Sequence, residues 1–124
     1  MRQYFKIFII LLFFGLQADT FTVPSTDYPT IQSALDVALD GDIVSVGAGI
    51  YNENLKIETD VKLISVSGPS STTINGSSQT LGGTLSSTIT VRPKSNATTI
   101  PQNIEIDGFK ITGGIGNKMK KEET

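Results

Sequence analysis

The sequence predicts an all-β chain built from short strands, with one helix near its beginning. Thr, Ser, Gly and Ile are abundant and long helix-forming stretches are scarce, a mixture typical of β-structure with many tight turns. Apolar positions taken as equivalent, Val44, Ile64, Ile89 and Ile111, recur at intervals of roughly 20 to 25 residues. A repeat of that length favours a solenoid, in which each coil of chain stacks on the coil before it.

Each predicted strand is a short apolar or β-branched run bounded by turn residues. The strands are expected at 21–23, 43–46, 61–66, 88–91 and 104–106, and 109–111 continues the last strand beyond the Asp107-Gly108 turn. Residues 67–87 and 93–101 are rich in Ser, Thr, Gly or Pro and are expected to loop out. An antiparallel sandwich stays open as the alternative, although it predicts hairpin signals and these connections look long and irregular.

One amphipathic helix is predicted before the second strand. Its apolar stripe follows the i, i+3, i+4, i+7 spacing of a helix face and consists of Ile31, Ala34, Leu35 and Ala38. Pro29 suits the first turn, and Asp27 or Thr30 is expected to cap the free N–H groups. Gly41 is the predicted C′ residue that ends the helix.

Residues 1–18 read as a secretory signal peptide. Arg2 and Lys6 precede an uncharged apolar run that reaches Leu16, and Leu16-Gln17-Ala18 suits signal cleavage. The alternative is a retained membrane anchor, but a spanning helix needs about 20 apolar residues and this run is about half as long. Cleavage would leave eight basic and twelve acidic residues, a net charge of −4. The expected location is therefore secreted or cell-surface.

Composition excludes several function classes. No basic stripe exists outside the extreme tail, so nucleic-acid binding is not expected. The chain has no cysteine, so it must fold without disulfides, and it has no histidine, the commonest metal ligand and general base near neutral pH. No cofactor and no metal site is predicted, and no membrane span is expected after signal cleavage.

An ordered set of short motifs resembles a known superfamily. The motifs are Val23-Pro24, Asp27-Tyr28-Pro29-Thr30-Ile31-Gln32, Ala34-Leu35, Asp40-Gly41-Asp42, Gly49-Ile50-Tyr51-Asn52-Glu53-Asn54, Gly68-Pro69, Thr73-Ile74-Asn75-Gly76 and Ile106-Asp107-Gly108-Phe109. Together they resemble the opening of pectin-lyase-like proteins, a superfamily that includes pectinesterases. The similarity runs from residue 21 to about 116. It implies a single-stranded right-handed parallel β-helix whose N-terminal end is capped by the early helix.

The segment Gly49-Ile50-Tyr51-Asn52-Glu53 is similar to the first sequence block of pectinesterases, G-x-Y-x-E. Many β-helix proteins that are not esterases share this block, so Gly49, Tyr51 and Glu53 are interpreted as structural: a turn glycine, a packed tyrosine and a carboxylate that satisfies turn amides. The aspartates, glutamine and arginine of the later pectinesterase blocks have no counterpart. Esterase chemistry is therefore assigned to no residue of the chain.

Two carboxylate pairs are weighed as sites. Glu105 and Asp107 lie two residues apart on one face of a strand, about 6.6 Å of rise, near the lower limit of the spacing in inverting glycoside hydrolases. They are weak catalytic candidates, against the simpler reading of a solvent-facing Glu followed by an Asp-Gly turn. Asp40 and Asp42 fall short of the six to eight oxygen ligands that calcium takes, and are read as turn residues.

Two functions of different classes stay open. In the first, residues 19–116 form the cap and first coils of a secreted, non-catalytic β-helix that binds carbohydrate, such as cell-wall polysaccharide, or serves as structure. In the second, the chain is the N-terminal part of a polysaccharide-acting enzyme (a pectinesterase, lyase or hydrolase) whose catalytic coils lie downstream. Few coils are recognisable, so an open C-terminal edge and self-association through it are expected. Residues 117–124 read as a charged, disordered tail.

Overall fold

The computed structural model describes residues 17–78 and 87–114. The predicted tail at 117–124, and all of the predicted signal peptide except residues 17 and 18, lie outside the described residues. The described elements are β1 (Thr20–Val23), α2 (Ile31–Val37), β2 (Ile43–Val46), β3 (Gly49–Tyr51), β4 (Leu55–Ile57), β5 (Lys62–Ser65), β6 (Thr72–Asn75), the 3₁₀ turn η2 (Gly76–Ser78), β7 (Ile89–Val91), β8 (Glu105–Asp107) and β9 (Lys110–Thr112). Within residues 17–78 and 87–114 this confirms a mainly-β structure with one α-helix.

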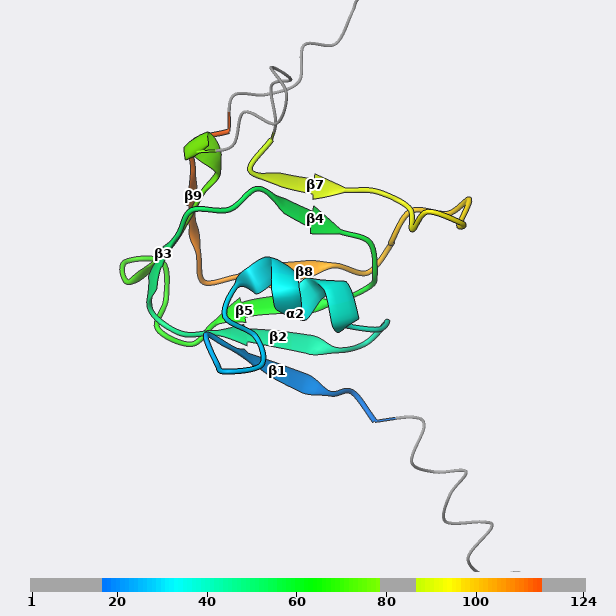
Figure 1. The fold of residues 1–124 in the computed structure, drawn as a ribbon, viewed down its shortest axis with the longest axis horizontal. Coiled ribbons are helices and arrows are strands. Elements are labelled where there is room, and N and C mark those ends of the chain that lie inside the picture. The colour runs from blue at the N-terminus through cyan, green and yellow to red at the C-terminus, as the bar shows by residue number, and fades with distance from the viewer. Residues whose placement is uncertain (1–16, 79–86, 115–124) are drawn as a thin grey trace, which may run out of the picture.

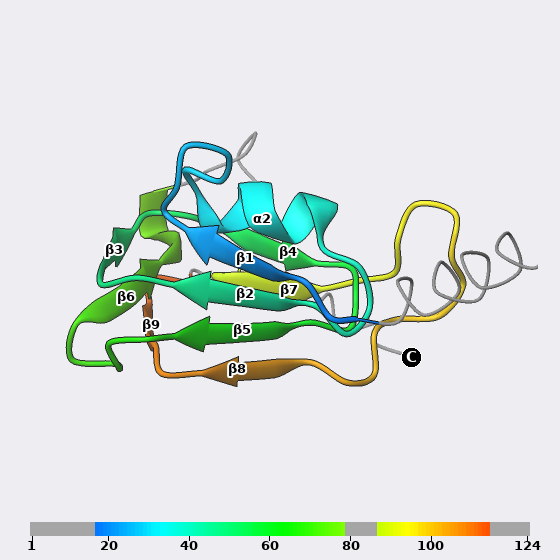
Figure 2. The ribbon, with the colours of Figure 1, turned by 90° about the horizontal axis from the view of Figure 1, so that it is seen from below.

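The strands form three sheets, with the orders β1-β2-β5-β8, β3-β6-β9 and β4-β7, here called the first, second and third sheets. From β2 onward the chain visits them in a fixed order: β2, β3 and β4, then β5, β6 and β7, then β8 and β9. Each such passage is one circuit. The three sheets lie around a common interior (Figure 1), and the strands of the first sheet stack side by side (Figure 2).

Every strand pairing among the described residues is parallel, which excludes the antiparallel sandwich. The register places equivalent residues of successive circuits above one another, in ladders that alternate between the interior and solvent. One interior ladder is Phe21, Val44, Leu63 and Ile106, and a second joins Tyr51, Ile74 and Ile111. The core is therefore a stack of apolar ladders contributed by short, separate segments.

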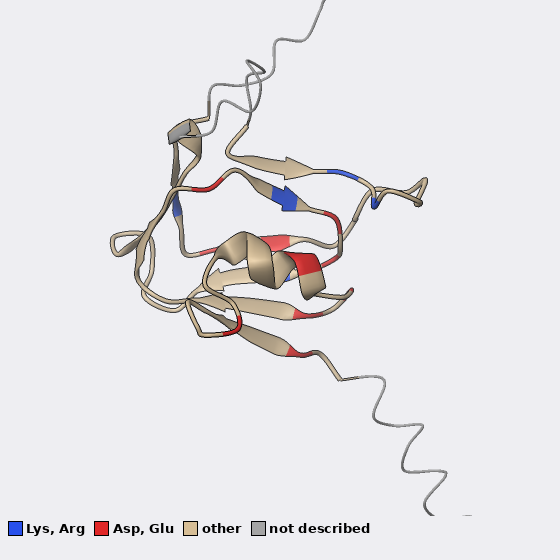
Figure 3. Cartoon of the chain, viewed as in Figure 1, with Lys and Arg blue, Asp and Glu red and all other residues tan. Residues whose placement is uncertain are grey.

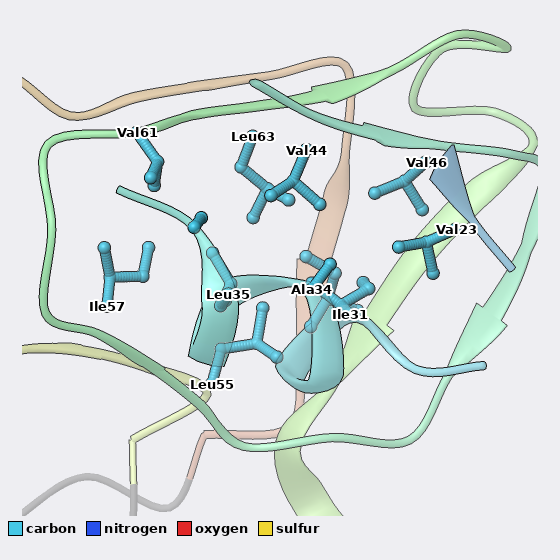
Figure 4. Packing of buried hydrophobic residues seen from close by; sticks show 12 residues of the cluster. Val23, Ile31, Ala34, Leu35, Val44, Val46, Leu55, Ile57, Val61 and Leu63 are labelled. Atoms are coloured by element: carbon cyan, nitrogen blue, oxygen red, sulfur yellow. The ribbon is translucent and has the colours of Figure 1, made fainter. Parts of the chain in front are cut away.

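Helix α2 covers the β1–β2 end of this interior. It contacts β1, β2 and β4, and its residues Ile31, Ala34 and Leu35 are buried. Figure 4 shows these side chains among core residues of the strands. Burying an Ile or Leu side chain contributes about 1.5–3 kcal/mol, so the helix face supplies a large part of the packing at this end.

The helix begins as predicted and ends differently. Thr30 is the N-cap and forms a reciprocal capping box with Ser33. Pro29 precedes the cap and is not in the first turn. The C-cap is Ala38, in an extended conformation, so the assignment of Gly41 as C′ residue was wrong. Gly41 instead has φ +94° in the turn that leads into β2, a conformation that favours glycine.

Three strands were missed by the sequence reading: β3, β4 and β6. β6 lies inside 67–87, so that segment does not loop out as a whole. The residues taken as equivalent were also misaligned. Val44 pairs with Leu63 and not with Ile64, while Ile89 belongs to the third sheet and Ile111 to the second. Residues 109–111 do not continue β8, because Gly108, with φ +83°, turns the chain into another sheet.

The ladders lose their cover at the opposite end. Leu63 is fully buried and its partner Ile106 is 36% exposed, and Ile74 is fully buried while Ile111 is 49% exposed. Ile57 and its partner Val91 follow the same trend in the third sheet. Within the described residues, β7, β8 and β9 therefore form an open end whose interior side chains meet solvent.

Candidate functional site

The turns that close successive circuits lie beside one another and form a groove. They are Leu39–Asp40 before β2, Glu58–Asp60 before β5 and the longer segment 94–102 before β8. The space between them has a volume of about 680 Å³. We call it the turn groove; its lining residues are Leu39, Asp40, Glu58, Thr59, Asp60, Lys94, Ala97, Thr99, Ile100, Pro101 and Gln102.

Two aspartates fix the turns to one another. Asp40 Oδ1 accepts a hydrogen bond from the Asp60 amide at 2.9 Å. Asp60 Oδ1 in turn accepts from the amides of Gln102 and Asn103 at 2.7 and 2.8 Å. Each carboxylate thus satisfies main-chain donors of the next turn, which otherwise have no ladder partner. The walls of the groove are held in place by these contacts.

Asp42, which does not line the groove, has a comparable structural role. Its side chain is almost completely buried and accepts from the amides of Asp19 at 2.9 Å and Leu39 at 2.8 Å. Asp40 and Asp42 therefore serve different turns. Among the described residues no group of three or more carboxylates could hold a metal ion.

The charged side chains in and beside the groove differ in whether they form an ion pair. Arg92 Nε lies 2.7 Å from Glu58 Oε1, so this carboxylate is paired, whereas Lys94 has no ion pair with any described residue. Figure 3 shows basic residues on the segment that follows β7 and acidic residues on the turn that follows β4. Leu39 and Ile100 add apolar surface, with exposed fractions of 64% and 52%. The groove therefore combines an amine, hydroxyls and aliphatic side chains.

Of the G-x-Y-x-E residues, Glu53 contacts the helix, and none of the three lines the turn groove. Glu53 accepts from the amides of Ile31 and Gln32, both at 3.0 Å, and so satisfies the first free N–H groups of α2. Tyr51 donates its hydroxyl to the Gly47 carbonyl at 2.8 Å. Its ring lies against Gly49, where an added Cβ would approach to 3.4 Å. Burial, and secondarily the charge of Glu53, raise the pKa of Tyr51 above its usual value.

Glu105 and Asp107 lie on the outer face of β8, in register with Lys62 and Ile64. Both are exposed. Glu105 Oε2 lies 3.5 Å from Lys62 Nζ, in an ion pair open to solvent. The two carboxylates thus share a face, as the strand period predicts, and neither lines the turn groove.

Sequence reasoning missed the turn groove. The spacing of Asp40 and Asp60, about one circuit, was a usable signal, because the parallel register of β2 and β5 brings the turns before these two strands together. The segment 93–101 was read only as a loop. Its Ile100 and its Lys94, which has no ion pair among the described residues, line a groove only together with turns that lie far away in the sequence.

Comparison of the chain with protein-family models, with curated proteins and with solved structures finds no match. Within 17–78 and 87–114, no helix has the length and apolar character needed to cross a bilayer.

Proposed function

We propose that the three sheets form a right-handed parallel β-helix of the pectin-lyase-like kind, and that the secreted protein binds polysaccharide in the turn groove without cleaving it. The repeated order of the sheets and their parallel pairing support the β-helix. The ordered motifs between residues 23 and 109 support the superfamily. Residues 19–114 then contain the capping helix and the circuits that build the groove.

The observation that carries the proposed binding is the mixture of groups along the groove. Leu39 and Ile100 offer aliphatic surface to the C–H face of a sugar ring, and Lys94, Thr59 and Thr99 offer hydrogen bonds to its hydroxyls. Because the groove crosses the turns of three circuits, it extends along the direction in which circuits stack. An extended polymer fits such a surface better than a compact ligand.

The carboxylates of the groove support binding over catalysis. Asp40 and Asp60 accept main-chain hydrogen bonds, and Glu58 is paired with Arg92. A general acid and base pair needs two carboxyl groups that face the scissile bond and differ in protonation. Here each carboxylate already has a structural partner.

The test is affinity electrophoresis of the full chain in gels that contain polygalacturonate, xylan or dextran. We expect retardation in at least one gel and a loss of affinity of at least about tenfold in the variant Lys94→Ala/Ile100→Ser, since one charge-assisted hydrogen bond contributes about 1.5–3 kcal/mol. Lys56→Ala/Val66→Ser is the matched control, because both residues are exposed and lie outside the groove. Equal retardation of the two variants would overturn the assignment to the groove.

An assay for new reducing ends and released methanol or unsaturated products accompanies the gels. No product is expected. Product formation by the pure chain would instead support the alternative of a polysaccharide-acting enzyme.

A further inference from the structure

β8 presents an unpaired main-chain edge. Within the described residues it pairs with β5 on one side and with no strand on the other. Its outward N–H and C=O groups are therefore available to another strand, as in peptide recognition by strand addition. At the opposite edge of the same sheet, β1 contacts helix α2. Thus β1, at one edge of the first sheet, lies against a helix, whereas β8, at the other edge, has no described element paired to its outer side.

The side-chain ladders that end on β8 determine which side chains an added strand would need at each position. The outer ladder already pairs Lys62 with Glu105, as an ion pair of 3.5 Å. The interior ladder pairs Leu63 with Ile106, which is 36% exposed. A strand added to β8 would place one side chain against Ile106, toward the interior, and the residues on either side of it against Glu105 and Asp107.

The charges of β8 determine which side chains suit the two flanking positions of the added strand. Glu105 and Asp107 are exposed carboxylates on one face, and Asp107 forms no ion pair with a described residue. Lysine or arginine opposite each of them would form cross-strand pairs like that of Lys62. The best complement is therefore a basic residue, an apolar residue and a second basic residue in succession. This pattern reads the same in both strand directions.

The same charges oppose pairing of β8 with its own copy. A two-fold axis through Ile106 would place Glu105 opposite Asp107 of the other copy. An axis through Glu105 or Asp107 instead would place two identical carboxylates opposite each other. Self-association through this edge, which the sequence led us to expect, is therefore disfavoured near neutral pH.

We propose that β8 is a docking edge for an extended segment of a separate protein in which basic side chains flank an apolar one. The added strand would bond to the outer edge of β8, cover Ile106 and neutralise Glu105 and Asp107. This inference does not depend on polysaccharide binding, because the turn groove and the outer face of β8 share no residue.

The probe is a blocked nine-residue peptide of alternating lysine and valine, titrated into the full chain and followed by amide NMR shifts. We expect saturable shifts at Glu105–Asp107 and no comparable shifts at Thr20–Val23, the other edge. The variant Glu105→Lys/Asp107→Lys should weaken binding at least about tenfold. The matched charge control Asp27→Lys/Asp36→Lys alters exposed acidic residues elsewhere and should stay within about threefold, because distant surface charges are screened.

Two control peptides separate strand addition from general attraction of a cation. Replacing each valine by proline keeps the charge but removes the main-chain donor of every second residue, and replacing each lysine by glutamate keeps the strand pattern but reverses the charge. Neither should shift β8. Equal binding of the proline peptide, or equal shifts at β1, would overturn the proposal.

Other occupants of the edge give distinct results. Residues 118–120, Lys-Met-Lys, also have the basic, apolar, basic pattern. A gain in peptide affinity in Lys118→Glu/Lys120→Glu would show that the chain's own segment competes and would overturn a separate partner. A dimer in sedimentation that Ile106→Lys dissolves would likewise assign the edge to a second copy.

Discussion

The two ends of the stacked strands meet solvent in different ways. At the β1–β2 end, α2 lays Ile31, Ala34 and Leu35 over the interior, and its first amides are bonded by Thr30 and Glu53. A helix suits this position because its main chain bonds to itself, so it covers apolar side chains without needing a strand partner.

At the end formed by β7, β8 and β9, the same ladders finish on exposed residues. Val91, Ile106 and Ile111 come from three different sheets and continue ladders that are fully buried one circuit earlier. Main-chain groups on the outer side of these strands also lack a ladder partner within the described residues. The difference shows that the capped end requires a change of element, since another strand would present a new edge.

The largest expected contrast is between two isoleucines of one ladder. Ile74→Ala should lower the free energy of unfolding by about 2–5 kcal/mol, because the side chain is fully buried and leaves a cavity. Ile111→Ala, one circuit later and half exposed, should cost about 1 kcal/mol or less. Urea unfolding of both variants measures this, and equal losses would show that the open end is covered in solution.

The carboxylate that caps the helix comes next. Glu53→Gln keeps the size of the side chain and removes its charge from the amides of Ile31 and Gln32, so a loss of about 1.5–3 kcal/mol is expected. Thermal unfolding with a helix signal in circular dichroism reports the change. If this substitution leaves the stability unchanged, Glu53 does not stabilise the capped end.

Alkaline pH should weaken the capped end through Tyr51. Burial first, and Glu53 second, raise its pKa in the folded state, so the unfolded chain ionises first as the pH rises through about 10. The stabilisation is fully present below that pH and falls as pH increases toward the folded pKa. Tyr51→Phe should lose about 1 kcal/mol at neutral pH with the bond to Gly47, and should show a smaller alkaline decline than the unaltered chain. If the stability of this variant falls with rising pH as steeply as that of the unaltered chain, groups other than Tyr51 cause the decline.

The smallest effect is expected at the open end. Glu105→Gln removes an ion pair with Lys62 whose two side chains are about half exposed, so the loss should be below about 1 kcal/mol and should vanish at high salt. Comparison with Glu53→Gln under identical conditions gives a direct ratio of the two ends. A larger loss at Glu105 than at Glu53 would reverse the comparison.

Much of the capped end could be predicted from local sequence, because its signals lie close together. The i, i+3, i+4, i+7 stripe and Thr30 mark α2, and β2 has the predicted bounds. The partner of the helix amides could not be predicted this way. Glu53 lies more than twenty residues from Ile31, and only the register between circuits brings the two together.

Strands of three residues carry too little pattern to be recognised alone. β3 and β4 are this short and were missed, and β6 was hidden in a Ser/Thr-rich segment where its Thr72 is buried against expectation. The alignment of Val44 with Ile64 failed by one residue, which in a strand reverses the face. The turn groove could not be predicted for a related reason, since its three walls come from separate circuits.

Native-state amide hydrogen exchange of the full chain tests the central contrast most directly. Two amides each join an edge strand of the first sheet to its neighbour: Gly47 donates to Val23 at the capped end, and Glu105 donates to Val61 at the open end, at 2.7 and 3.1 Å. We predict that Gly47 exchanges at least about tenfold more slowly than Glu105, because opening near a covered core costs more free energy. Equal protection of the two amides, or slower exchange at Glu105, would contradict an interior that is closed by α2 at one end and open at the other.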